Sequence, residues 1–176
     1  MHDDIETMEK LRRQASHLPS PLDRIPRKAE VSDEESGEVS CSAFGFLRGL
    51  HDRALSLEFR FRNGNALSFT YSWLGTVSFN PSVGLLLKFT GDLVYLVLIR
   101  GSNLDAVTPG RAVNLTDRGI NRHRIIWVRE MDDNELRRAG EGEPTIDRIE
   151  VAEFASNEEL QEWLKMAAPT FMRKQT

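Results

Sequence analysis

The sequence predicts an α+β fold built on a compact antiparallel β-barrel or sandwich of about five to seven strands. Hydrophobic residues make up 40% and charged residues 28% of the 176 residues, which is ordinary usage for a globular domain. Apolar and polar residues alternate over 55–71, and a longer apolar stretch at 82–104 carries a turn signal near its middle. A capped amphipathic helix near the C-terminus is expected to cover the strands, and a flexible extension is expected at the N-terminus.

The first 40 residues are expected to stand apart from the globular part of the chain. Residues 3–15 have the apolar spacing of a short amphipathic helix. Residues 19–40 contain three prolines and an acidic, serine-containing cluster, a composition typical of a flexible linker. The remaining residues, 41–176, are expected to form a single globular domain. Within it we expect a β core and then a C-terminal strand and helix, at 54–130 and 146–168.

The first predicted hairpin has the alternation of a half-exposed sheet. Leu55, Leu57, Phe59 and Phe61 are expected to share one apolar face and alternate with Ser, Glu and Arg, and the apolar alternation resumes at 67–71. Between these segments, Asn63-Gly64 is a strong signal for a hairpin turn. A further strand at 75–80 ends before Pro81, which cannot donate a hydrogen bond to a neighbouring strand.

The stretch 82–104 is predicted to be a second β-hairpin and neither a membrane span nor a buried helix. A membrane helix needs about 20 apolar residues with few charges, whereas Lys88 and Asp92 lie near the middle of this stretch. Gly91-Asp92 has poor helix propensity but suits a two-residue turn with the glycine at positive φ. Leu85 and Leu87 are expected on one face of the first strand and Leu86 on the other. Both faces of the two strands are largely apolar, so the hairpin must be covered on both sides and is expected to form the core.

The segments on either side of these hairpins have weaker patterns. Residues 43–50 are expected to pack on the core as a lead-in to the first strand, not to lie on a membrane surface. After Arg100, glycine and proline predict mostly loop with one short helix near 113–118. The remaining predicted elements are a strand at 124–130 with Trp127 in the core, a short acidic helix within 131–144, a strand at 146–154, and a final helix with a capping box formed by Ser156 and Glu159.

The formal net charge of −4 is distributed unevenly along the chain. Residues 1–40 carry 10 acids and 6 bases, residues 41–129 carry 5 acids and 11 bases, and residues 130–176 carry 12 acids and 6 bases. A basic centre between acidic ends predicts one of two things. Either the centre binds an anionic partner, or the segments of opposite charge pair within the molecule.

The basic stretch 111–129 is the first place to look for a ligand site. It carries five arginines and a histidine, and arginine is suited to phosphate and carboxylate groups. A second candidate place is the end of the buried strand, where Arg100 and Asn103 flank a glycine. The alternatives are ion pairing of these arginines with the acidic C-terminal segment and an ordinary strand exit at 100–104. The candidate ligand-binding residues are Arg100, Asn103, Arg111, Arg118, Arg122, His123 and Arg124.

No pattern indicates catalytic, metal or cofactor chemistry. A nucleophilic pair of Cys41 with His51 would need a closeness that the sequence does not indicate. The four histidines have no metal-ligand spacing, and the paired carboxylates lie in segments expected to be exposed. We therefore predict no catalytic residue, no metal and no cofactor.

The leading functional hypothesis is a non-enzymatic interaction module that binds a protein partner or a second copy of itself. The alternative is binding of nucleic acid, or another anion, through the arginine-rich segment 111–129. In that case the acidic N-terminal segment would act as an autoinhibitory mimic of the ligand. An enzyme whose site is spread over several loops is a third possibility. The start of the chain lacks the pattern of a signal peptide, so a cytoplasmic protein is expected.

Overall fold

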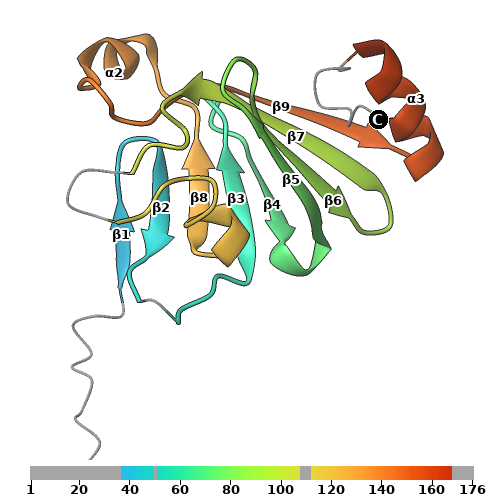
Figure 1. Ribbon diagram of the computed structural model, residues 1–176, viewed down its shortest axis with the longest axis horizontal. Helices are drawn as coiled ribbons and strands as arrows, with labels where there is room; N and C mark the ends of the chain where they lie inside the picture. The colour runs from blue at the N-terminus through green and yellow to red at the C-terminus, as the bar shows by residue number, and fades with distance from the viewer. Residues whose placement is uncertain (1–36, 50, 108–111, 168–176) are drawn as a thin grey trace, which may run out of the picture. The chain divides into compact units, whose positions relative to one another are not determined.

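The computed structural model describes residues 37–49, 51–107 and 112–167 (Figure 1). The predicted N-terminal helix and nearly all of the predicted linker lie outside these residues. Nine strands form within the described part, more than the sequence predicts. The strands are β1 (Glu38–Ser40), β2 (Phe44–Leu47), β3 (Ser56–Arg60), β4 (Ala66–Thr70), β5 (Leu74–Asn80), β6 (Gly84–Thr90), β7 (Val94–Ser102), β8 (Ile125–Arg129) and β9 (Thr145–Phe154). The helical elements are the 3-10 helices η3 (Tyr71–Trp73) and η4 (Ile120–Arg122) and the α-helices α2 (Asp133–Arg138) and α3 (Asn157–Ala167).

The strands form two separate sheets, so of the two predicted alternatives, barrel or sandwich, the barrel is wrong. The five-stranded sheet has the order β1-β2-β8-β3-β4, and the four-stranded sheet has the order β5-β6-β7-β9. The four-stranded sheet is antiparallel throughout, and its strands lie side by side in Figure 1. The five-stranded sheet is mixed, because β3 and β8 pair in parallel while its other pairs are antiparallel.

The chain leaves one sheet for the other at η3, and this is why the predicted succession of five antiparallel strands does not close. The hydroxyl of Thr70 accepts from Ser72 N and caps the turn. The next residue, Tyr71, is buried and donates its hydroxyl to Ile125 O in β8 at 2.8 Å. Tyr71 therefore fixes the turn against the five-stranded sheet, and the chain continues into β5 of the other sheet.

One hydrophobic core is shared by the two sheets. Phe59 and Phe69 come from the five-stranded sheet and Phe89 from the four-stranded sheet. The rings of Phe69 and Phe89 stack with centroids 4.6 Å apart, and Phe59 meets Phe89 edge to face at 6.2 Å. Aromatic pairs of these two geometries add to the free energy gained by burying the rings.

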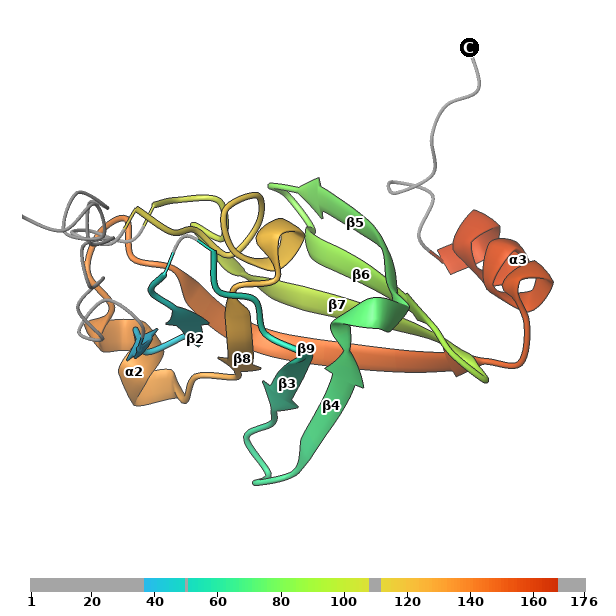
Figure 2. The same cartoon turned by 90° about the horizontal axis from the view of Figure 1, so that it is seen from below.

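The prediction that the 82–104 hairpin is covered on both faces is confirmed. On one face, Leu85, Leu87 and Ile99 belong to the shared core and are fully buried. On the other face, Leu86 and Leu96 pack in a second cluster. That cluster also contains Phe154 of β9 and Leu160 of α3, so the C-terminal helix covers the outer face of the hairpin. Figure 2 shows α3 following directly on the end of β9.

The two hairpin turns differ in how they match their predictions. At the first, Gly64 has φ of 83° and lies between Phe61 and Asn65, whose backbones are hydrogen-bonded, so the predicted turn is confirmed. At the second, Thr90 is paired with Val94, so the connection has three residues and not the two predicted. Gly91 does not have positive φ; a Cβ there would lie 2.8 Å from the ring of Trp73. Close packing of Trp73, not turn conformation, requires this glycine.

Three further details differ from the prediction: where ordered structure begins, the position of one helical turn, and the cap of the last helix. Residues 38–40 and 44–47 form β1 and β2, so ordered structure begins before the predicted domain boundary at residue 41. The helix predicted near 113–118 is absent, and the helical turn of this segment is η4. The capping box of the last helix is half formed: Ser156 Oγ accepts from Glu159 N, while the Glu159 carboxylate accepts from Ala155 N.

Candidate functional site

Part of the basic centre pairs with the acidic C-terminal segment. Arg129 in β8 forms a two-bond ion pair with Glu135 in α2, and Arg62 Nη1 lies 3.1 Å from Asp133 Oδ1. Arg100 in β7 pairs with Glu150 on the neighbouring strand β9 at 3.0 Å. Ion pairs within the molecule therefore neutralise part of the difference in charge between the basic centre and the acidic C-terminal segment.

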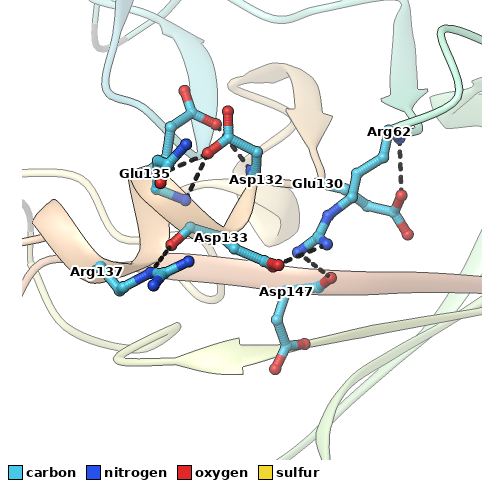
Figure 3. Close-up of polar contacts among 8 residues, drawn as sticks. Arg62, Glu130, Asp132, Asp133, Glu135, Arg137 and Asp147 are labelled. Atoms are coloured by element: carbon cyan, nitrogen blue, oxygen red, sulfur yellow. Dashed lines mark hydrogen bonds and ion pairs between the residues drawn. The ribbon is translucent and has the colours of Figure 1, made fainter.

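Figure 3 shows how the acidic segment surrounds Arg62. The guanidinium of Arg62 reaches between the Asp133 carboxylate and the backbone carbonyl of Asp147, while its backbone N–H donates to Glu130. These contacts link the first hairpin to the segments before and after α2. All of these groups are at least partly exposed, so each pair contributes little to stability and their main effect is to neutralise the arginines.

The predicted binding segment is a packed loop whose arginines have different environments. Leu115 and Ile120 are fully buried in the shared core. Asn114 is also buried, where it accepts from Arg118 N and donates to Asp105 O. With these side chains facing inward, Arg118 and Arg122 are left on the surface.

Arg124 points into the protein and has a structural role. Only 5% of the residue is exposed, and its guanidinium donates three hydrogen bonds to two backbone carbonyls, Leu47 O and Arg48 O, at 2.8–3.1 Å. In return, Leu47 N donates to Arg124 O. Burial is the main reason why the pKa of Arg124 lies below its ordinary value, and the charges of Arg53 and Arg122 lower it further. Arg124 thus ties the end of β2 to the start of β8.

Two exposed arginines, Arg53 and Arg122, act on this buried guanidinium through their charges, and a third, Arg48, accepts from it through its backbone carbonyl. Arg122 is the last residue of η4, and Arg48 and Arg53 lie in the loop after β2. This loop is fixed against η4 because Ala54 N donates to His123 O at 2.7 Å. We call Arg48, Arg53 and Arg122 the cationic surface. The charges of Arg53 and Arg122 act on the buried Arg124, and so does the opposite charge of Asp52.

An apolar side chain projects beside the cationic surface. Leu55 is 87% exposed, although the sequence predicts that it faces the core with Leu57. Its backbone lies between η4 and η3, because the preceding residue bonds to His123 O and Leu55 O accepts from Tyr71 N. His123 has φ of 54° and stacks on the ring of Tyr71 at 4.5 Å. The ring stack fixes the backbone that carries both Leu55 and Arg122.

Among the described residues, the contacts found for the other predicted ligand-binding side chains lie elsewhere. Arg118 Nη1 donates to Ala112 O at 3.3 Å, and Arg100 is paired with Glu150. Asn103 has φ of 56° and donates to Glu143 O, which is the behaviour of a residue in a tight strand exit. Arg111 lies outside the described residues.

Two residues of the cationic surface were missed by reasoning from sequence. Arg48 and Arg53 are far in the chain from the arginine-rich segment, and pattern analysis treats their surroundings as a lead-in to the first strand. They lie near η4 because β2 pairs with β8, and this pairing cannot be predicted from the alternation of apolar and polar residues.

Among the described residues, no group of three or more His, Cys, Asp and Glu side chains could hold a metal ion. Cys41 Sγ lies 3.5 Å from Phe44 O. No helix in the described ranges is long and apolar enough to cross a membrane. The comparisons with known proteins add no further direction: no family model, curated protein or solved structure matches this chain.

The buried Tyr71 hydroxyl leads to a prediction about the free energy of unfolding at alkaline pH. Burial raises the pKa of Tyr71 far above its usual range. In the unfolded chain the same hydroxyl ionises near pH 10, so the free energy of unfolding should fall above about pH 10, by up to about 1.4 kcal/mol per pH unit. Tyr71→Phe should lose about 1 kcal/mol at neutral pH, with the hydrogen bond, and show a shallower alkaline decline. Urea unfolding at about pH 9 and pH 11 measures both effects, and parallel declines in the two proteins would contradict the assignment.

Proposed function

We propose that the protein is a non-enzymatic interaction module that binds an acidic segment of a partner protein at the cationic surface. The observation that carries this proposal is the 87% exposure of Leu55 beside Arg53 and Arg122. An exposed leucine on backbone next to two exposed arginines suits a ligand that presents carboxylates together with an apolar side chain. Acidic peptide motifs have this composition, and arginine clusters are a recurrent means of recognising them.

Nucleic acid is the less favoured ligand. Of the arginines in 111–129, Arg124 is buried against carbonyl groups and Arg129 is paired with Glu135. A bound nucleic acid spans several phosphates and is held by rows of cationic side chains. Beyond the cationic surface it would meet a chain of net charge −4. A short acidic peptide needs only the few guanidinium groups present here, and it can also bury Leu55.

The test uses three fluorescent probes: a peptide of glutamate with interspersed leucine, a peptide of glutamate with interspersed glycine, and a single-stranded oligonucleotide of equal length. Anisotropy is measured at about 50 mM and about 300 mM salt. We expect the Glu/Leu peptide to bind best and to weaken with salt, because its carboxylates meet partly screened arginines. Arg53→Gln with Arg122→Gln should weaken it by about tenfold or more, equivalent to about 1.4 kcal/mol.

Leu55→Ser separates the apolar contact from the charge. We expect this change to weaken the Glu/Leu peptide but not the Glu/Gly peptide, and to alter the free energy of unfolding by less than about 0.5 kcal/mol. Met166→Ser is the matched control, because Met166 is similarly exposed at 80% but lies on α3. Arg137→Gln with Arg138→Gln is the charge control on α2. Equal loss in the controls, or tighter binding of the oligonucleotide than of both peptides, would contradict the proposal.

A further inference from the structure

The last strand of the five-stranded sheet, β4, has an open edge. Among the described strands it pairs with β3 alone, and in Figure 2 no other strand lies along its far side. The pairing of β3 with β4 is regular along the whole of β4, without a bulge. β4 also carries neither a charged residue nor a proline, the features that commonly keep foreign strands away from an edge. This edge is therefore suited to the addition of a strand.

The hydrogen bonds at the two ends of β4 show which of its backbone groups face the open edge. Before the strand, Phe61 N donates to Asn65 O at 2.9 Å. After the strand, Tyr71 N donates to Leu55 O at 2.9 Å. Because bonded and non-bonded pairs alternate along an antiparallel ladder, every second residue of β4 points its N–H away from β3. These residues are Ala66, Ser68 and Thr70.

The two faces of β4 present different side chains at this edge. On the outer face Ala66 and Ser68 are exposed, and Ser68 is paired with Glu58 of β3. On the inner face Phe69 is buried in the shared core. Leu67 points to the same side as Phe69, because side chains alternate along a strand, yet it is 36% exposed. A strand added at the open edge would cover Leu67.

We propose that β4 pairs with β4 of a second copy of the chain, antiparallel about a two-fold axis. The register with the greatest overlap places Ser68 opposite Ser68 of the second copy, and Ala66 opposite Thr70. In the same register Leu67 lies opposite Phe69 of the second copy, so the exposed leucine gains an apolar neighbour on the inner face. No like charges meet within the pair of strands, since β4 has no charged residue.

A second copy suits this edge better than an unrelated strand. Self-pairing requires a strand whose residues match their own reversed order, and β4 has apolar residues on one face and only Ala, Ser and Thr on the other. A two-fold pairing also uses both β4 edges, so the association ends at a dimer. The edges of the other sheet are less suited, because β9 is charged and the pairing of β5 is irregular after Leu74.

The contact is small, so we expect the dimer to be weak. Each copy contributes one strand of five residues, and the buried area should lie below the roughly 1,200 Å² at which standard protein interfaces begin. Both strands are already ordered by their pairing with β3, so little conformational freedom is lost on association. We expect a dissociation constant on the order of 10–100 µM. Dimer formation does not depend on the proposed acidic ligand.

The first measurement follows amide hydrogen exchange of the full chain by NMR, with sedimentation equilibrium on the same samples. In a monomer the Ser68 N–H faces solvent, whereas the Leu67 N–H is bonded to β3. We expect exchange at Ser68 to slow by about four- to sixfold between about 20 µM and about 1 mM protein, as the monomer fraction falls. Exchange at Leu67 should stay unchanged, and sedimentation should give the mass of a dimer at the higher concentration.

The second measurement changes the residue on the two-fold axis. In Ser68→Lys the new side chain is paired with Glu58 within one copy, so the urea midpoint should not fall, but two copies would place like charges opposite each other. We expect the dissociation constant to rise by about tenfold or more, and Ser68→Glu should have the same effect. An equimolar mixture of the two variants should associate again. Ser78→Lys on β5 is the matched control and should leave association unchanged.

A dimer with slowed exchange at Ser68, weakened by either charged variant and restored in their mixture, would support the proposal. A chain that stays monomeric at the higher concentration would overturn it. A dimer that Ser68→Lys does not weaken would also overturn it, because the contact would then lie elsewhere. Loss in both variants without recovery in the mixture would contradict antiparallel pairing about Ser68. A monomer whose Ser68 amide is protected by the Glu/Leu peptide would show that the edge takes a foreign strand, against the proposal.

Discussion

Replacing Phe89 by alanine is expected to lower the free energy of unfolding by about 3–5 kcal/mol, the largest effect of any substitution considered. Phe89 is fully buried in β6 at the place where the two sheets meet. Its ring stacks on Phe69 and meets Phe59 edge to face, so alanine would leave a cavity bounded by both rings. Neither sheet can close this cavity without losing its own strand pairing, since β6 is paired on both sides.

Urea unfolding followed by tryptophan fluorescence measures this loss. An unchanged dependence on urea would show that the transition is still two-state and that stability alone has changed. Phe89→Leu is the control, because it keeps an apolar side chain of similar reach and should cost about 1–2 kcal/mol. A loss below about 2 kcal/mol for Phe89→Ala would mean that the core relaxes easily, which a core shared between two sheets does not predict.

The second large effect is expected at Arg124. Arg124→Met keeps much of the apolar volume but leaves Arg48 O and one acceptor site of Leu47 O without the guanidinium donor. A buried acceptor left without its donor costs about 1–3 kcal/mol, so for the two carbonyls together we expect a loss of about 3 kcal/mol. For a domain of this size that loss lowers the melting temperature by about 6–12 °C.

Arg124→Lys tests whether the geometry of the guanidinium or only its positive charge stabilises the fold. Lysine keeps the positive charge but cannot place donors on two carbonyls in the planar arrangement of a guanidinium. We therefore expect it to recover less than half of the loss. Arg118→Met is the matched control, since Arg118 is exposed and should change stability by less than about 0.5 kcal/mol. Full recovery by lysine would show that charge alone matters at this position.

Local pattern was sufficient for the central hairpin of the fold. The sequence predicts that Leu85 and Leu87 face one way and Leu86 the other, and the two clusters confirm this assignment. Such a prediction succeeds because alternation on a strand follows from backbone geometry alone. The prediction for Leu55 failed for a related reason: β3 begins only at Ser56, so Leu55 lies outside the alternation.

The placement of β8 could not be predicted in the same way. Residues 125–129 read correctly as a strand, but they lie between β2 and β3 and are parallel to β3. A parallel neighbour is selected by contacts between segments far apart in the chain, which alternation does not encode. The same limit applies to the candidate site. Arg122 and Arg124 look equivalent in the sequence, and only the carbonyls at the end of β2 decide that Arg124 is buried.

The strand order of the four-stranded sheet has a consequence for association through sheet edges. At one edge, β9 carries Asp147, Arg148, Glu150 and Glu153, and such charges discourage the addition of a foreign strand. At the other edge, β5 has no charged residue between Leu74 and Asn80. Its ladder is irregular after Leu74 and the strand ends before Pro81, which leaves only the stretch 76–80 in regular pairing. That stretch is shorter than the segments of about six or seven residues that stack into amyloid. The short β5 therefore limits association at one edge of the sheet, and the charges of β9 limit it at the other.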